Sequence, residues 1–196
     1  MGRPKQFDPD VVIDQAMDVF WRKGYGSTTP QDLVDETGIG KGSLYHAFGS
    51  KHALFTRALE RYRDTQAAAL VELLGGHGSV RDRLRAGFEV LVEIDLGDPG
   101  RRGCFGVNTA TELGGVDQEA TELVRRMFER TEGAFRAALE EGRRSGEIDA
   151  RLDVHAAASL LLATVIGMRV IARTADGPER LHRVVDGALD GVLGTL

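Results

Sequence analysis

The stretch Thr29-Pro-Gln-Asp-Leu-Val-Asp-Glu-Thr-Gly-Ile-Gly-Lys-Gly-Ser-Leu-Tyr-His-Ala-Phe48 decides the fold of this chain, because it predicts two short helices joined by a tight turn. Thr29 can cap the first helix, Pro30 suits its first position, and Asp32 stands where the acid of a capping box is found. Gly38 supplies the left-handed backbone that ends a helix sharply. Residues 29–48 therefore have the layout of a helix-turn-helix motif.

The second of these helices has a buried face and a polar outer face. Leu44 and Phe48 are four residues apart, so they share one side, while Lys41, Tyr45 and His46 remain on the outside. Tyr45 and the following Lys51 are expected to bind DNA phosphates, whereas Ser43 and His46 are candidates for contacts with base edges. The full set of expected DNA contacts in this region is Thr29, Gln31, Lys41, Gly42, Ser43, Tyr45, His46 and Lys51.

Two basic residues near the start of the chain extend this prediction. Arg3 and Lys5 flank a proline in a Gly-Arg-Pro-Lys segment. Such an arm can enter the minor groove beside a helix-turn-helix. The alternative interpretation is a disordered tail, and the sequence does not separate the two.

The run Gly-Ser-Leu-Tyr-His-x-Phe-x-Ser-Lys, from Gly42 to Lys51, closely resembles the DNA-binding module of the TetR family of bacterial transcriptional regulators. The resemblance implies a DNA-binding domain over residues 1–50 and a helical effector-binding and dimerisation domain over residues 51–196. Gly40 departs from the family, which usually has a capping serine or threonine there, and Ala47 replaces a position that is often aromatic. Because of these departures, the resemblance does not predict which operator sequence the protein binds.

The rest of the chain is expected to be helical. Asp8 and Pro9 begin a first helix that Gly24 ends, and no alternating strand pattern occurs anywhere in the sequence. The fold class is therefore all-α with about nine helices, three of them in the N-terminal helix-turn-helix domain. After the helix-turn-helix, the expected helices cover about 50–74, 79–96, 102–113, 117–146, 153–174 and 178–196.

The last two expected helices are apolar over more than one face. A helix that is apolar most of the way round must be covered on both sides, and one chain covers only one of them. A homodimer is therefore expected. The residues predicted at its interface are Leu161, Val165, Leu181, Val185, Leu189 and Val192.

A ligand pocket is predicted around the helix over 102–113. Phe105, Asn108 and Glu112 share one face of it, and other apolar helix faces should pack around them. The alternative is that Asn108 bonds a neighbouring backbone group and that Glu112 is exposed to solvent. The residues predicted to bind a small-molecule effector are Phe88, Cys104, Phe105, Asn108, Glu112, Phe128 and Met168.

Cys104 has two interpretations. A position near a helix N-terminus, beside Arg101 and Arg102, can lower the pKa of a thiol and make it a redox or electrophile sensor. The segment around it also resembles a pocket-lining helix of electrophile-sensing members of the family. The favoured interpretation is a small buried hydrophobe.

Composition is that of a globular protein. The 196 residues include one cysteine, which excludes an intrachain disulfide and is consistent with a cytoplasmic location. The net charge of −5 divides into +1 over residues 1–63 and −6 over the remainder, which places the positive balance on the DNA-binding side. The longest apolar segment, 156–171, is interrupted by polar residues and is expected to be a buried helix, and the chain opens without an apolar leader.

The hypothesis is a homodimeric repressor that releases a double-stranded DNA operator when a small molecule binds. The five histidines are scattered and no catalytic motif occurs, so no enzyme activity, cofactor, metal or membrane partner is expected. One alternative keeps DNA binding but assigns the signal to redox chemistry at Cys104. Another is a helical carrier or enzyme that does not bind DNA.

Overall fold

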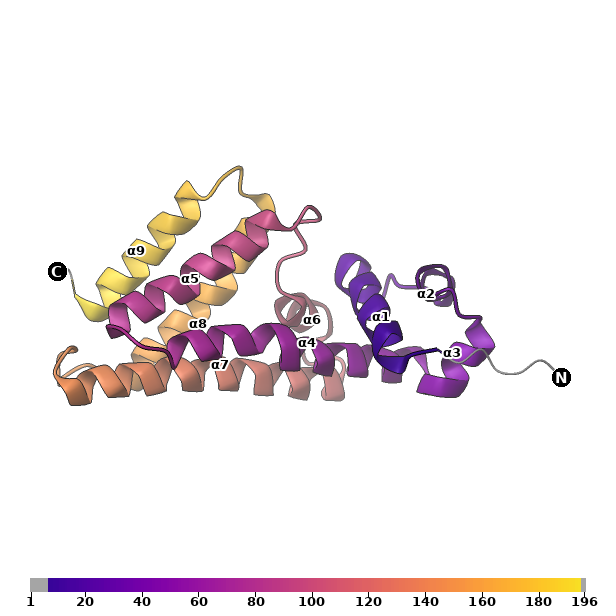
Figure 1. The fold of residues 1–196 in the computed structure, drawn as a ribbon, viewed down its shortest axis with the longest axis horizontal. Helices are drawn as coiled ribbons and strands as arrows, with labels where there is room; N and C mark the ends of the chain where they lie inside the picture. Colours follow the sequence, from indigo (N-terminus) through magenta and orange to yellow (C-terminus); the bar gives the residue numbers. More distant parts are fainter. Residues whose placement is uncertain (1–6, 195–196) are drawn as a thin grey trace.

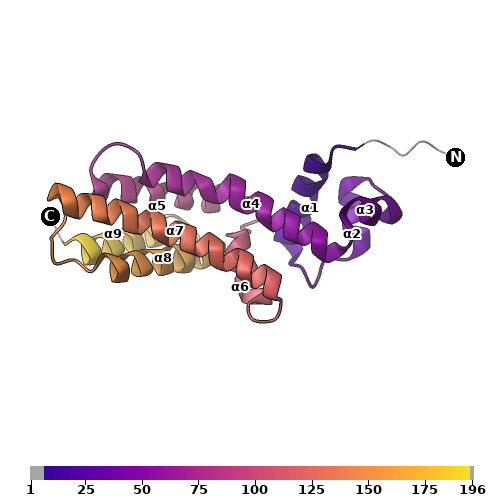
Figure 2. The same ribbon diagram turned by 90° about the horizontal axis from the view of Figure 1, so that it is seen from below.

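The computed structural model describes residues 7–194, without the side chains of residues 66 and 67, and all regular structure within this part is helical. Helices gather at the two ends of an elongated molecule, and α4 runs between them alongside α7 (Figures 1 and 2). The expected nine α-helices are confirmed for the described residues. They are α1 (Pro9–Lys23), α2 (Pro30–Thr37), α3 (Lys41–Phe48), α4 (Lys51–Leu74), α5 (Val80–Gly97), α6 (Phe105–Leu113), α7 (Gln118–Ser145), α8 (Val154–Ile171) and α9 (Glu179–Leu193), with a 3₁₀ turn η1 (Ala172–Thr174) after α8.

Side-chain caps fix the helix starts as the sequence predicted. The Thr29 hydroxyl accepts from the Asp32 backbone N–H, and the Asp32 carboxylate accepts from the Thr29 N–H, which completes a capping box. Gly38 ends α2 in the left-handed region, with φ of 67°. Gly40 caps α3 without a side-chain hydrogen bond. The turn between α2 and α3 therefore has the geometry of a helix-turn-helix.

Two hydrophobic cores hold the molecule together. The first joins α1, α2, α3 and the first part of α4 to α6 and the start of α7, and the second joins the end of α4 and α5 to the rest of α7, α8 and α9. Trp21, Tyr62 and Phe105 meet within the first core, with ring centroids 5.0 to 6.1 Å apart. Because the first core contains residues of both α3 and α4, packing is continuous across residue 50, and the domain boundary there remains a prediction.

The start of α6 differs from the expected one. A helix was expected from Arg102, but α6 begins at Phe105 with Cys104 as its N-cap. Arg101 and Gly103 both lie in the left-handed region, with φ of 47° and 68°, and the Asp98 carboxylate accepts from the Arg102 backbone N–H at 2.7 Å. The loop after α5 is therefore folded around Asp98, and this replaces the first helical turn.

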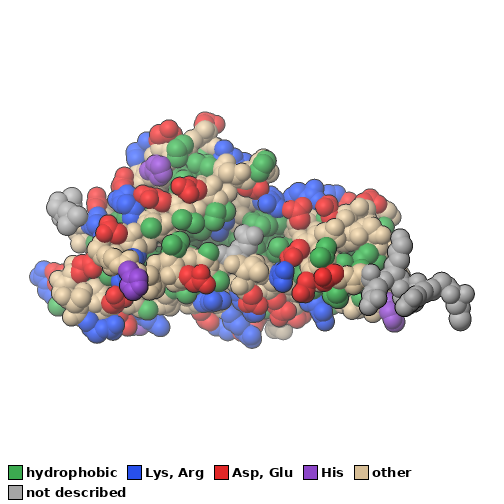
Figure 3. Space-filling model, in the orientation of Figure 1, with side chains coloured by type: hydrophobic (Ala, Val, Ile, Leu, Met, Phe, Trp, Pro, Cys, Tyr) green, Lys and Arg blue, Asp and Glu red, His purple; other side chains and the backbone are tan. Residues whose placement is uncertain are grey.

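Helix α8 and η1 together cover almost the whole range expected from the sequence, 153–174. They form a 21-residue segment, Val154–Thr174, whose hydropathy of 1.8 and length would suffice to cross a membrane. Its inner face nevertheless packs against α7 and α9 in the second core. Charged side chains gather along the lower edge of the molecule, over α7, where Glu122 pairs with Arg125 and Arg126 (Figure 3). The apolar helix therefore belongs to a folded domain that presents charge to solvent.

Candidate DNA-binding surface and ligand cavity

Helix α3 presents a polar face at one end of the molecule. Leu44 and Phe48 are buried, whereas Lys41, Ser43 and His46 are exposed. Gly42 is exposed on the same helix, and Thr29 and Gln31 are exposed at the start of α2. Gln31 donates to Asp35 at 2.7 Å within α2. The predicted contact residues 29–46 thus share one end of the molecule, while Arg3 and Lys5 lie outside the described residues.

Tyr45 and Lys51 are less free than the sequence suggested. Tyr45 is half-buried against the first core, and burial raises the pKa of its phenol. The Lys51 ammonium donates to the carbonyl oxygens of Tyr25 and Thr28, at 2.9 Å each, and lies 4.2 Å from the centroid of the Tyr25 ring. Two of the three Lys51 donors therefore hold the turn between α1 and α2, and the contact of Lys51 with a DNA phosphate remains a prediction that would use the third.

Glu112 binds the same turn from α6. Its two carboxylate oxygens accept from the backbone N–H groups of Tyr25 and Gly26, at 2.9 and 2.6 Å. Lys51 holds the carbonyls of the turn and Glu112 holds its N–H groups, so we call these two residues the turn clamp. The prediction that Glu112 lines a ligand pocket is wrong in this structure, because its carboxylate is used to connect α6 to the helix-turn-helix.

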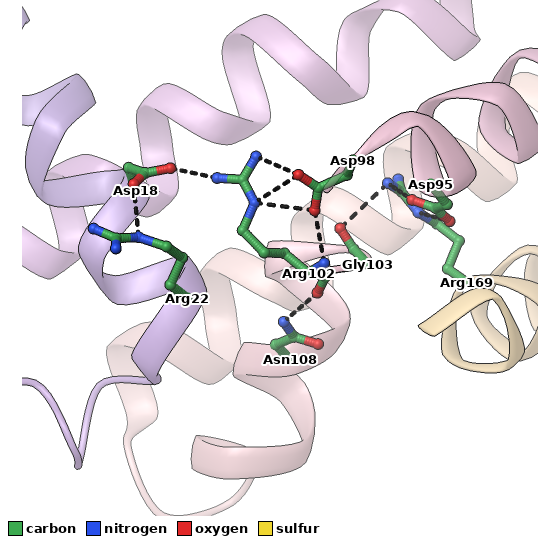
Figure 4. Close-up of polar contacts among 8 residues, drawn as sticks. All are labelled: Asp18, Arg22, Asp95, Asp98, Arg102, Gly103, Asn108 and Arg169. Carbon is green, nitrogen blue, oxygen red and sulfur yellow. Dashed lines mark hydrogen bonds and ion pairs between the residues drawn. The ribbon is translucent and has the colours of Figure 1, made fainter. Parts of the chain in front are cut away.

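Two further polar contacts connect the DNA-binding end to the rest of the molecule. Arg102 pairs with Asp18 of α1 and with Asp98 (Figure 4). Its guanidinium also lies 4.4 Å from the centroid of the Trp21 ring. The His52 Nε2 atom of α4 lies 2.7 Å from the Asp117 carboxylate that caps α7. A backbone hydrogen bond from Ala120, with the neighbouring His52, lowers the pKa of Asp117. These contacts orient α1 and α4 against α6 and α7.

A cavity of about 50 Å³ lies between α4, α6, α7 and α8. Two of the predicted ligand-binding residues, Cys104 and Phe128, line it. Most of its wall is apolar, and its polar groups come from Tyr62, Thr131 and Arg169. The other lining residues are Leu70, Leu91, Val107, Met127, Leu162, Val165 and Ile166.

The remaining predicted ligand residues lie elsewhere. Asn108 donates to the Arg102 carbonyl at 2.9 Å (Figure 4). It also accepts from Arg173 at 3.3 Å, so it stabilises the loop before α6. Phe105 is buried in the first core, and Phe88 and Met168 are buried in the second. The prediction that the face of α6 with Phe105 and Asn108 lines the cavity is therefore corrected. The residues of this region that line it are Val107 and the capping Cys104.

A buried polar cluster lies beside the cavity. The Tyr62 hydroxyl donates to the Cys104 sulfur at 3.4 Å, and the Arg169 guanidinium donates to Asp95 through Nε at 3.1 Å and Nη2 at 2.7 Å. Nη2 also lies 3.5 Å from the Gly103 carbonyl (Figure 4). Burial raises the pKa of Asp95, and Arg169 opposes this shift. Tyr62 and Arg169 were not expected at this site, because each lies on a largely apolar helix face far in the sequence from Cys104 and Asp95.

The predicted dimer residues face inward. Leu161, Val165, Leu181, Val185, Leu189 and Val192 are all at most 7% exposed, within the core of a single protomer. They cannot also form an outer surface, so this prediction is corrected. The outward side of α8 carries Leu160, Ala163 and Val170, with Leu160 52% and Val170 49% exposed. The outward side of α9 includes the exposed small residues Gly187 and Gly191.

The tyrosines should report their burial in an alkaline titration. Burial raises the pKa of Tyr25, Tyr45 and Tyr62 in the folded state, so ionisation disfavours the fold as pH rises above about 10, the value in unfolded chains. We expect the native phenol absorbance at 295 nm to rise at higher pH than that of the urea-unfolded chain. Coincident curves would contradict the described burial, and Tyr62→Phe should remove the last step to ionise.

Comparisons with known proteins agree with this geometry. Residues 12–58 match the family model described as bacterial regulatory proteins, tetR family, and residues 80–188 match the tetracyclin repressor-like C-terminal domain. The chain is 34% identical to the uncharacterized HTH-type transcriptional regulator YezE of Bacillus subtilis, over 96% of this chain and 98% of that protein. It is 31% identical to the HTH-type transcriptional repressor ComR of Escherichia coli, over 96% and 90% of the two chains.

A solved structure shows the same architecture. A cysteine mutant of the TetR family transcriptional regulator CifR, complexed with a 26-base-pair double-strand operator DNA, superposes with a TM-score of 0.85 at 28% identity. The match covers 97% of this chain and all of that one.

Proposed function

Because this chain belongs to the TetR family of bacterial regulatory proteins, we propose that its α3 surface binds an operator and that its cavity receives the effector controlling that binding. The chain is a DNA-binding transcriptional regulator and not an enzyme, and it acts as a homodimer. This assignment excludes the carrier or enzyme alternative. A regulator of this kind would work in the cytoplasm, where its DNA is.

The observation that carries operator binding is the exposed polar face of α3 over buried Leu44 and Phe48. The exposed side chains of Lys41, Ser43 and His46 would enter a major groove, and the start of α2 would lie on the backbone. In a two-fold dimer the two α3 helices would reach half-sites about one helical turn apart, or a multiple of it. A repressor with this geometry blocks RNA polymerase wherever such a site overlaps a promoter.

A titration with operator DNA tests this assignment. Lys41→Ala removes a charge near the phosphates in both protomers, so we expect operator affinity to fall roughly tenfold to a hundredfold and the salt dependence to become shallower. The control is Arg151→Ala, which removes an exposed charge from the loop between α7 and α8, where Arg151 pairs with Asp149 at 2.7 Å, and it should bind the operator as wild type does. Equal affinities and salt slopes for wild type and Lys41→Ala would remove α3 from the interface.

The effector would act by a population shift. The cavity wall includes Cys104 and Val107 of α6, and α6 carries Glu112, which holds the turn between α1 and α2. An occupant that favours a displaced α6 would favour a different orientation of the helix-turn-helix, and hence a different spacing of the two α3 helices. The outward faces of α8 and α9 would join the two protomers and transmit this change in spacing.

One observation supports the second candidate, an electrophile sensor. Cys104 lines the cavity and its sulfur accepts from the Tyr62 hydroxyl. A small electrophile that enters the cavity would meet this thiol. Exposure to such a reagent followed by intact mass measurement tests the idea: one adduct that is absent in Cys104→Ser, together with loss of operator binding, would support it. Loss of operator binding by an unmodified protein would favour the reversible effector.

A further inference from the structure

The cavity has one charged lining group, the guanidinium of Arg169. Arg169 is only 8% exposed, and its partner Asp95 is 3% exposed. Two of the three guanidinium nitrogens, Nε and Nη2, are used by Asp95, and Nη2 additionally approaches Gly103. This side chain is therefore fixed in position by bonds on one edge of its planar fork.

The third guanidinium nitrogen of Arg169, Nη1, is not used by these contacts. Nη1 of Arg169 makes no hydrogen bond with any residue in the described part of the chain. A guanidinium carries two N–H donors on this atom, and Nη1 is not one of the fully buried side-chain atoms that lack a partner, so an occupant can reach it. A nine-tenths buried cation that lines a cavity with two unused donors is suited to receive an acceptor from an occupant of that cavity.

The charges decide which kind of acceptor fits. Arg169 and Asp95 already neutralise each other, so a carboxylate in the cavity would add one uncompensated negative charge to a buried site. It would also approach Asp95, which repels it. A neutral carbonyl-type oxygen can accept from Nη1 without either cost, and the remaining wall, formed by residues such as Leu91, Met127 and Phe128, is suited to an apolar body.

We propose that the cavity takes an uncharged, mostly apolar molecule whose carbonyl-type oxygen accepts hydrogen bonds from Nη1 of Arg169. This inference rests on the proposed function, because it names the chemical class of the effector. A cavity of about 50 Å³ is far smaller than the roughly 300 Å³ or more of a typical ligand pocket. An occupant with a ring must therefore displace the wall, which includes Cys104 and Val107 at the start of α6.

Three probes of matched shape test the proposal in the purified dimer. Ethylbenzene supplies the apolar body alone, acetophenone adds a neutral carbonyl, and benzoate replaces it by a charge. Calorimetric titration should show acetophenone binding at least roughly tenfold more tightly than the other two, since it alone gains a charged-donor hydrogen bond without a buried net charge. Benzoate as the tightest probe, or equal affinities for acetophenone and ethylbenzene, would overturn the proposal.

Variants assign the preference to the guanidinium. Arg169→Lys keeps a cation for Asp95 but lacks the second edge of the fork, so acetophenone should fall to the affinity of ethylbenzene, while ethylbenzene is unchanged. Arg85→Lys, on an exposed ion pair with Asp186, is the control and should keep the preference. If Arg169→Lys does not fold, the double variant Asp95→Leu with Arg169→Met removes both charges together and should also lose the preference.

Operator binding, measured on the same preparations, separates this inference from the proposed function. Wild type that binds operator but prefers no probe with a carbonyl would refute the inference alone. Wild type that does not bind any operator would refute the proposed function, whatever the probes do. Retention of the acetophenone preference in the double variant Asp95→Leu with Arg169→Met would remove Arg169 from the site.

Discussion

Val185→Glu is expected to unfold the protomer, whereas Ala163→Glu is expected to give a folded monomer that no longer binds the operator. Val185 is 1% exposed and packs in the second core. A buried unpaired charge costs several kcal/mol, a large part of the roughly 5 to 15 kcal/mol that stabilises a typical domain. Ala163 is exposed on the outward side of α8, so its replacement remains hydrated until a second copy covers it.

Thermal melting followed by circular dichroism, together with sedimentation, distinguishes the two outcomes. Ala137→Glu is the matched control, because Ala137 is exposed on α7, away from the proposed interface. It should remain folded and dimeric. Ala163→Glu that stays dimeric at wild-type concentrations would place the interface elsewhere, and Val185→Glu with an unchanged melting temperature would contradict the inward packing of α9.

Helix starts could be predicted from the sequence because caps act over a few residues. The side chains of Asp8, Thr29, Ser50, Ser79 and Asp117 each accept from a backbone N–H two or three residues ahead. These signals are local, so they survive in any tertiary context. The exception, α6, starts late because Asp98 binds the Arg102 backbone in a loop that periodicity does not describe.

The direction of a helix face could not be predicted in the same way. In α8 the inward Leu161 and the outward Leu160 are adjacent in a helix that is apolar nearly all round, so its period does not indicate which side meets α9.

Long-range polar partners were equally inaccessible to the sequence. Arg169 and Asp95 are 74 residues apart, and Glu112 and Tyr25 are 87 apart. The sequence showed that Asn108 and Glu112 were polar residues on an otherwise apolar helix, which predicted that each has a specific polar partner. The bond of Asn108 to the Arg102 carbonyl agrees with the alternative that this side chain bonds a neighbouring backbone group. The partners of Glu112 could not be predicted, because the backbone N–H groups of Tyr25 and Gly26 are brought close only by the packing of α1 and α4 against α6 and α7.

Glu112→Ala is expected to disconnect the effector cavity from the DNA-binding surface. The substitution removes both acceptors of the turn clamp on the α6 side, so the N–H groups of Tyr25 and Gly26 lose their partners. Lys51 still holds the carbonyls of the turn, so the helix-turn-helix should stay folded and bind the operator within a few-fold of wild type. Amide hydrogen exchange at Tyr25 and Gly26 should become faster.

The effect on signalling should be much larger than the effect on basal binding. Coupling between two sites typically changes the affinity at one of them by about 5-fold to 150-fold. In Glu112→Ala, α6 no longer binds the turn between α1 and α2, so a displacement of α6 does not reach the helix-turn-helix by this contact. We expect a cavity-binding probe that weakens operator binding of wild type to leave Glu112→Ala unaffected, although the probe still binds. Glu122→Ala, which removes only exposed ion pairs on α7, is the control and should respond as wild type does. An unchanged response in Glu112→Ala would mean that α6 acts on the recognition helix by another route. The remaining polar contacts described are those of Arg102 with Asp18 and of His52 with Asp117, and Phe105 of α6 also packs against Trp21 of α1.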